Sequence, residues 1–343
     1  MTTQKILTLS RKLNERDHYL IKKSGVSIHY ESRYLPLIGV SFTDIDQLST
    51  MDFVSESHYV DTLNFSELSF QTTAIFCPGL PKRHLVNNQL VGFGGVKVAV
   101  LDSGVNFAVD ETTDFTGYGM TDVRDHGTKV VEIIKTYAPR AHVLVAKVGH
   151  TASTDLDIMR GIEWAIDRGA NIINISAGQM RGCQGTCNMA KLINKVTVAE
   201  NVMIVVSAGN AGPNIGSIGC PGCAEHAITV GAIAPNGTVA DYSGRGFPGS
   251  IKPNILAPGK IYLENNREDE GTSFSAPAIT GILAASLSNV GTNGKVIEYL
   301  YNTAQCLGLE KHVQGFGMVD LKKFVEVIGN GKTIDNSTGQ GQS

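Results

Sequence analysis

Five short apolar runs, each bounded by Gly, Asp or Ser, dominate the chain from residue 96 onwards. Such runs are typical of strands that are buried on both faces, as in a parallel sheet. They lie at residues 96–101, 143–146, 172–175, 202–206 and 227–230. Between them, apolar residues recur at three- and four-residue spacings, which predicts helices around residues 158–166 and 189–196. This alternation predicts a doubly wound, mostly parallel α/β domain over residues 96–328.

Residues 1–63 follow a different pattern, in which short alternating stretches replace the apolar runs. They predict a small α+β unit with strands at 26–30, 37–42 and 52–54 and a helix at 44–51. Residues 64–95 contain Pro and clustered Gly and are expected to form a linker and the start of the larger domain. The last residues, 329–343, are rich in Gly, Asn, Ser, Thr and Gln, and we expect them to be disordered.

The composition limits the expected partners and location. The 29 basic and 32 acidic residues leave a net charge of −3, so nothing favours binding to nucleic acid or to an anionic membrane. No stretch has the form of a secretion signal or the length of a membrane span, so we expect a cytoplasmic protein. In that compartment the six cysteines are expected to be free thiols instead of a disulfide framework.

Two polar residues lie at the ends of predicted elements, where sites are often found. Asp102 directly follows the strand at 96–101, at the sheet edge where open α/β sheets place their sites. His126 precedes an apolar helical run, and an imidazole there can act as a general base if a carboxylate orients it. Taken alone, each also fits a bland interpretation, as a turn residue or a polar helix end.

Two further motifs are built around small residues. Ser273 lies in Gly-Thr-Ser-Phe-Ser-Ala-Pro at the entry to a predicted helix, with Pro277 expected in its first turn. Small neighbours let a substrate backbone approach, and the positive helix end favours negative charge at a nucleophile. Asn210 follows the strand at 202–206, and its side-chain amide could donate to an oxyanion or simply occupy a turn.

Together the four motifs resemble those of the subtilisin family of serine proteases: AVLDSGV around Asp102, DHGT around His126, SAGNAGP around Asn210 and GTSFSAP around Ser273. The resemblance covers roughly residues 90–327 and implies a catalytic triad of Asp102, His126 and Ser273 that performs acyl transfer. It implies that Asn210 belongs to the oxyanion hole. It also implies extended polypeptide substrates that pair with the enzyme as an added strand. The implied substrate-binding residues are Ser176, Ala177, Gly178, Ala208, Gly209 and Gly219.

Residues 1–63 resemble, more weakly, the inhibitory prodomain of this family. We therefore expect the protease to bind its own N-terminal unit and to cleave itself near the Leu63–Asn64 bond, with Phe65 as the neighbouring alternative. Leu63 would then fill an apolar primary pocket. The alternatives are an unrelated docking domain for residues 1–63 and, for the whole chain, a catalytically idle subtilisin-like scaffold used for binding or regulation.

The chain also departs from the family pattern. Lys129 and Glu132 replace a His and a Gly after His126, and Glu270 stands where a small or amide residue is usual. The link at 134–141 is too short for the family's calcium loop, so we expect no calcium there, no other metal and no cofactor. The C-x3-C and C-x2-C pairs, Cys183, Cys187, Cys220 and Cys223, could hold zinc, but their loose spacing favours free thiols or a disulfide.

Overall fold

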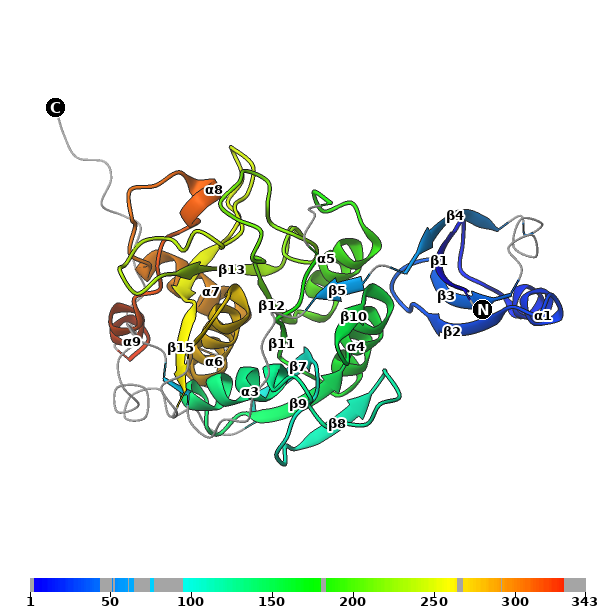
Figure 1. Ribbon diagram of the computed structural model, residues 1–343, viewed down its shortest axis with the longest axis horizontal. Helices are drawn as coiled ribbons and strands as arrows, with labels where there is room; N and C mark the ends of the chain where they lie inside the picture. Colours follow the sequence, from blue (N-terminus) through cyan, green and yellow to red (C-terminus); the bar gives the residue numbers. More distant parts are fainter. Residues whose placement is uncertain are drawn as a thin grey trace.

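The computed structural model describes residues 3–43, 51, 53–60, 62–64, 75–76, 95–179, 183–263, 268–290 and 292–329 (Figure 1). Most of the helix predicted at 44–51, most of the linker and the tail from residue 330 lie outside the described residues.

A seven-stranded sheet in the order β14-β13-β12-β11-β7-β9-β8 confirms the predicted α/β fold. Every neighbouring pair in it is parallel. The five predicted strands are present as β7 (Lys97–Asp102), β9 (His142–Lys147), β11 (Ile172–Ile175), β12 (Met203–Ser207) and β13 (Ile228–Ile233). The edge strands β8 (Glu111–Asp114) and β14 (Ile255–Pro258) were not predicted. The sequence of β8, Glu-Thr-Thr-Asp, has no apolar residue because the strand is only partly buried.

Helices cover both faces of this sheet. In β7, Val98 and Val100 belong to the core shared with α3 (His126–Tyr137) and α6 (Thr272–Val290). The alternate residues Ala99 and Leu101 belong to the core shared with α4 (Asp155–Asp167) and α5 (Asn188–Glu200). The central strands are therefore buried on both faces, which is why their apolar runs were visible in the sequence.

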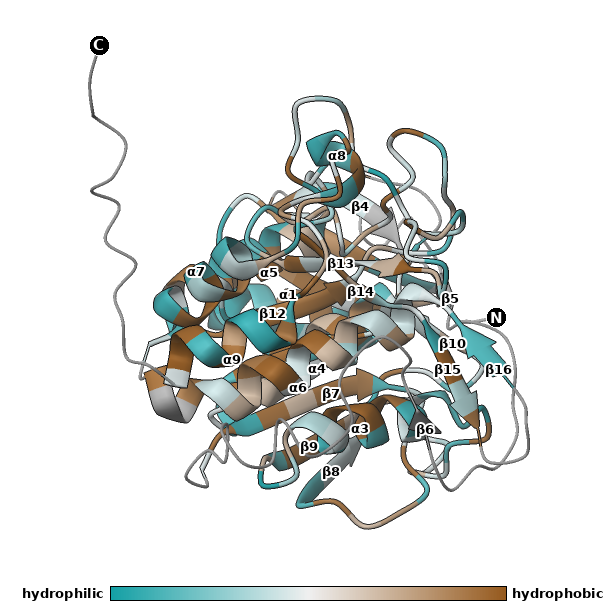
Figure 2. Cartoon of the chain, turned by 90° about the vertical axis from the view of Figure 1, so that its left-hand side faces the viewer, coloured by the Kyte–Doolittle hydropathy of each residue, from teal (hydrophilic) through white to brown (hydrophobic). Residues whose placement is uncertain are grey.

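Helix α6 runs through the middle of its layer, and Figure 2 shows apolar residues concentrated in this helix and in the central strands. Phe274, Ile279 and Ile282 of α6 are fully buried. The helix begins at Thr272, so Pro277 falls in its second turn. The prediction that Pro277 lies in the first turn is therefore wrong.

The N-terminal residues form a separate antiparallel sheet in the order β2-β3-β1-β4. Its elements are β1 (Thr3–Leu9), α1 (Glu15–Lys23), β2 (Ser27–Glu31), β3 (Leu37–Phe42) and β4 (Val54–Tyr59). The predictions for β2 and β3 are confirmed, but the third strand was misplaced, since β4 begins at Val54. Helix α1 was missed because only Asp17 and Ile21 are buried in it; its Asn14–Asp17 capping box was the available signal.

This N-terminal unit lies beside α4 (Figure 1), where Ile6 and Leu37 share a core with Leu156 and a buried carboxylate of α4 accepts its hydrogen bonds. Glu163 of α4 accepts hydrogen bonds from the Tyr30 hydroxyl at 2.8 Å, the Ser32 hydroxyl at 2.7 Å and the Arg33 backbone N–H at 3.2 Å. The Arg33 guanidinium also pairs with Asp167. Because a buried carboxylate needs such donors, these bonds fix the N-terminal unit on the helix.

Shorter elements complete the described chain. They are β5 (Thr62–Asn64), β6 (Ile75–Phe76), β10 (Ala152–Thr154), β15 (Lys260–Leu263), β16 (Glu268–Glu270), α7 (Asn293–Thr303), α8 (Lys311–Gln314) and α9 (Leu321–Gly329). Within the described part of the chain, no helix combines the length and apolarity needed to cross a membrane.

Candidate active site

Asp102 and His126 form a buried pair at the carboxyl edge of the sheet. Asp102 is the last residue of β7 and His126 the first of α3, and the His126 Nδ1 lies 2.7 Å from the Asp102 Oδ1. Gly127 permits this approach, since a Cβ there would lie 2.4 Å from the Gly104 carbonyl oxygen. When Asp102 accepts from Nδ1–H, the Nε2 of a neutral His126 is left as the proton acceptor.

The surroundings of His126 change its pKa in two opposing ways. Burial disfavours the charged imidazole, whereas the charge of Asp102 and its hydrogen bond favour it. Asp122 and Asp269 act in the same direction as Asp102, and together these carboxylates raise the pKa of His126 above its usual value. The imidazole is thus a stronger base than an exposed histidine.

Asp122 is a second buried carboxylate at the site, which the sequence analysis missed. Its Oδ2 accepts from the backbone N–H and the hydroxyl of Thr128, both at 2.8 Å, and its Oδ1 accepts from the Ser103 hydroxyl at 2.7 Å. The Ser103 backbone N–H in turn donates to the Asp102 Oδ1 at 2.7 Å. Asp122 therefore ties the start of α3 to the end of β7; an acidic residue four positions before His126 was the signal in the sequence.

Ser273 lies in the first turn of α6, directly before Phe274, whose ring centroid is 5.8 Å from that of His126. The Ser273 hydroxyl donates to the Ser176 carbonyl at 3.0 Å, and the Ser176 hydroxyl donates to the Ser273 carbonyl at 3.0 Å. Pro277 explains the second bond, because it has no N–H to occupy the Ser273 carbonyl within the helix. Ser273 is thus fixed against the end of β11.

Asn210 is held in one orientation by Thr272, the residue before Ser273. The Asn210 Oδ1 accepts from the Thr272 backbone N–H at 3.0 Å and from its hydroxyl at 2.9 Å. Both bonds use the amide oxygen, so the amide nitrogen points to the opposite side, toward Gly271. A Cβ on Gly271 would lie 3.1 Å from this nitrogen, so a small residue there keeps the donor accessible.

The predicted substrate-binding residues are brought together from three segments of the chain. Gly178 and Gly219 adjoin each other, since Gln179 N–H donates to the Cys220 carbonyl at 2.8 Å and a Cβ on Gly219 would overlap the Gln179 carbonyl oxygen. A Cβ on Gly209 would lie 3.8 Å from the Gly219 nitrogen. Ser176, Ala177 and Ala208 are buried at the ends of β11 and β12.

The segment predicted for self-cleavage lies in a short strand that pairs with the α/β domain. β5 pairs antiparallel with β10, with Leu63 opposite Ser153 and Asn64 opposite Ala152. Phe65, the neighbouring alternative, lies outside the described residues. The backbone at Leu63 and Asn64 is thus extended and paired, the geometry of an added strand.

Comparison with known proteins adds to this geometry. Residues 94–341 match the family described as the Subtilase family. The chain belongs to the subtilase family. It is 28% identical to M-protease from Shouchella clausii (strain KSM-K16), a match that covers 86% of this chain and 80% of that protein. It is 30% identical to subtilisin Savinase from Lederbergia lenta, over 68% of this chain and 91% of the relative.

Two solved structures are similar to this subtilase. The prenylagaramide maturation protease PagA matches with a TM-score of 0.61 and 28% identity, over 74% of this chain and 100% of that one. The epidermin leader peptide processing serine protease EpiP from Staphylococcus aureus matches with a TM-score of 0.75 and 19% identity, over 95% of this chain and 99% of that one. The likeness to EpiP shows a shared fold. This subtilase is thus a subtilisin-like member of a serine protease family.

The residues that depart from the family pattern lie in different surroundings, some buried and some exposed. Lys129, one turn after His126, is buried and its ammonium pairs with Asp269 of β16 at 3.1 Å. Glu270, at the end of β16, is exposed to solvent. Only residues 138–141 separate α3 from β9. Calcium independence at this place stays a prediction, and a melting temperature that rises markedly on adding calcium would contradict it.

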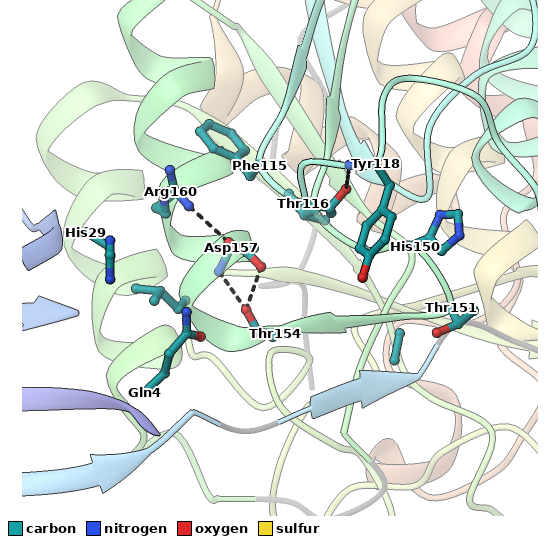
Figure 3. A pocket seen from close by; sticks show the side chains of 14 residues that line it. Gln4, His29, Phe115, Thr116, Tyr118, His150, Thr151, Thr154, Asp157 and Arg160 are labelled. Atoms are coloured by element: carbon teal, nitrogen blue, oxygen red, sulfur yellow. Dashed lines mark hydrogen bonds and ion pairs between the residues drawn. The ribbon is translucent and has the colours of Figure 1, made fainter. Parts of the chain in front are cut away.

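A cavity of about 460 Å³ lies beside β10, between the N-terminal unit and the α/β domain of this subtilase (Figure 3). Gln4 and His29 of the N-terminal unit line one side of it, while Tyr118 and His150 line another (Figure 3). The Tyr118 and His150 rings are stacked with centroids 4.5 Å apart. The two parts of the chain therefore meet at a polar cavity next to the strand that pairs with β5.

Proposed function

We propose that this subtilase is a serine endopeptidase, and the buried Asp102–His126 pair, which lies next to the ring of Phe274, the residue after Ser273, is the observation that carries the proposal. The Ser273 hydroxyl turns from the Ser176 carbonyl to the Nε2 of His126 and gives up its proton as Oγ attacks a peptide carbonyl. Asp102 holds the imidazole in the required tautomer and stabilises its charged form. His126 then protonates the leaving amine, and water releases the acyl group by the same steps in reverse.

The proposed oxyanion hole consists of the Asn210 side-chain amide and the backbone N–H of Ser273. Thr272 orients the amide before substrate arrives, so the donor needs no reorganisation when negative charge develops. The N-terminus of α6 adds a positive potential at the same place.

The substrates we propose are extended segments of polypeptide, which pair with the backbone at residues 176–178 and β10. The primary pocket is walled by small, uncharged residues: Ser176, Ala177, Gly178, Ala208, Gly209 and Gly219. We therefore infer a preference for apolar side chains before the cleaved bond; a strict preference for Arg or Lys in a peptide library would contradict it.

Residues 1–63 are proposed to be an inhibitory prodomain that is removed by self-cleavage near Leu63–Asn64. Two observations support this: Glu163 anchors the unit on α4, and β5 lies as an added strand on β10. PagA and EpiP are named for maturation and leader-peptide processing, so a precursor peptide is one substrate of this kind.

An active-site label tests the proposal directly. A fluorophosphonate should label Ser273 in the wild type and leave Ser273→Ala unlabelled, because only an activated serine reacts. A folded wild type that stays unlabelled would instead support a catalytically idle scaffold. Asp102→Asn serves as a second comparison, since it keeps the serine but removes the group that orients His126.

A further inference from the structure

Four cysteines that lie far apart in the sequence meet behind the proposed primary pocket. Cys183 lies in the loop before α5, and Cys187 is the N-cap of that helix. Cys220 and Cys223 flank the turn that follows Gly219. The Cys183 and Cys223 sulfurs are 3.1 Å apart, and the Cys187 and Cys220 sulfurs 2.6 Å apart. The sulfurs of Cys183, Cys220 and Cys223 all lie within 4.8 Å of one another. We refer to these four residues as the cysteine cluster.

We propose that the cysteine cluster binds one zinc ion through four thiolates, and that this ion holds together the two walls of the primary pocket. Four cysteine sulfurs are a common donor set of structural zinc sites, which are tetrahedral and closed to substrate. The spacing alone had favoured free thiols or a disulfide. The fold changes that balance because it brings Cys183, Cys220 and Cys223 together and places Cys187 against Cys220.

The backbone on each side of the cluster is arranged to present sulfurs. In the turn at 220–223, Cys223 N–H donates to the Gly219 carbonyl at 3.1 Å and Ala224 N–H to the Pro221 carbonyl at 2.9 Å. On the other side, Cys187 is the N-cap of α5, and its sulfur accepts the Ala190 N–H at 3.4 Å. This contact fixes the Cys187 sulfur at the start of α5, on the side that faces Cys220.

The grouping of the sulfurs, and not their separations, favours a shared ion over two disulfides. Both sulfur–sulfur separations exceed the roughly 2.05 Å of a disulfide bond. A disulfide joins only two sulfurs, whereas the sulfurs of Cys183, Cys220 and Cys223 are all neighbours of one another. Zinc–sulfur bonds of about 2.3 Å require sulfurs slightly under 4 Å apart, which small side-chain rotations in the cluster would provide.

Charge around the cluster fits the same occupant. Zinc with four thiolates carries a net negative charge, and the partly buried Lys252 lies against the residues that support the 220–223 turn. The ammonium is held by the Ala227 carbonyl at 2.6 Å and the Thr229 hydroxyl at 2.9 Å. The same Thr229 hydroxyl donates to the Gly222 carbonyl at 2.6 Å, which ties the lysine to the 220–223 turn. Outer partners of this kind orient metal ligands.

The place of the cluster gives the ion a role. Cys220 accepts the Gln179 N–H through its carbonyl, and a Cβ on Gly178 would contact that same carbonyl at 3.4 Å. An ion bound to both pairs would fix the segment 176–179 against Gly219. This role in the pocket rests on the proposed protease function, whereas zinc binding itself does not.

Metal content tests the proposal without catalysis. The full chain carrying Ser273→Ala, purified under reducing conditions without chelator, should contain one zinc per chain by elemental analysis. Cobalt(II) exchanged into it should give the absorption of a tetrahedral thiolate site. Cys183→Ser, Cys187→Ser, Cys220→Ser and Cys223→Ser should each lose most of the zinc and lower the melting temperature. Cys306→Ser is the matched control, because Cys306 is an exposed cysteine outside the cluster.

Several outcomes would overturn the zinc site. They are a metal-free protein whose four thiols all react with an alkylating reagent, a protein with two disulfides and no metal, and a protein that contains iron in place of zinc. If a serine variant fails to fold, zinc released from the intact protein by a thiol-blocking mercurial gives the same answer. Zinc in an enzyme that fluorophosphonate does not label would leave this inference intact and reject the proposed function. Zinc removal that leaves KM for apolar peptides unchanged would reject only the role in the pocket.

Discussion

At the scale of single residues, Thr272 decides what Asn210 can do. Because Thr272 occupies the amide oxygen twice, only the amide nitrogen faces the place where the oxyanion would form. Asn210→Ala should therefore lower kcat by about 100- to 1000-fold with little change in KM, the cost of losing one such donor in subtilisin. Steady-state kinetics on a chromogenic peptide measure this. Asn236→Ala, in an exposed turn, is the control; an unchanged kcat in Asn210→Ala would remove Asn210 from the mechanism.

The pKa of His126 makes a second residue-scale prediction, with a definite sign. Its neighbours raise this pKa, and catalysis needs the neutral ring, so kcat/KM should rise with pH through a midpoint above 6.5. Asp102→Asn removes the main raising interaction and leaves the burial that lowers the pKa. The acid limb should then move to lower pH, and the maximum should fall by about 10,000-fold. A pH–rate profile whose midpoint stays in place would show that Asp102 does not set the pKa of His126.

At the scale of elements, the interior strands of the sheet could be predicted from the sequence, whereas its two edge strands could not. The strands β7, β9, β11, β12 and β13 lie in the interior of the sheet, so their sequences are continuous apolar runs. β8 lies at an edge and α1 faces solvent, so neither carries such a signal. For the candidate site, the sequence signal was local: the motifs around Asp102, His126, Asn210 and Ser273 predicted these residues. Asp122 was not identified, because its partners Ser103 and Thr128 come from two different elements.

Helix α4 carries the contact that holds the N-terminal unit, and Glu163 is its centre. Glu163→Gln removes the charge that Tyr30, Ser32 and Arg33 share, and hydrogen bonds to charged groups contribute about 1.5–3 kcal/mol each. In the Ser273→Ala chain, Glu163→Gln should therefore speed amide exchange at Arg33 by at least about tenfold. Glu200→Gln is the matched control, since Glu200 also accepts a hydrogen bond from the N-terminal unit, but at an exposed position and from the Tyr34 hydroxyl. Equal exchange in the two variants would mean that Glu163 does not anchor the unit.

At the scale of the whole molecule, two contacts join the chain before residue 65 to the α/β domain. One is the docking of the N-terminal sheet on α4 through Glu163, and the other is the pairing of β5 with β10. The first positions the unit, and the second lays the chain before residue 65 in the direction of a bound substrate strand. A segment held in this way competes with other substrates for as long as the unit stays docked. The whole chain is therefore expected to be latent before cleavage.

Self-cleavage near Leu63–Asn64 follows from this arrangement. The wild type should yield a mature chain beginning at Asn64, or at Ser66 if Phe65 is used, because the backbone at Leu63 and Asn64 is extended and paired as an added strand is. Ser273→Ala should stay full length, since it lacks the nucleophile. Intact-mass analysis of the two proteins, expressed and purified in parallel, distinguishes these masses. Added back to the mature enzyme, the released fragment should inhibit casein digestion until it is degraded, because its docking contacts to α4 survive cleavage. A wild type that remains full length while digesting casein would show that residues 1–63 are a permanent docking domain.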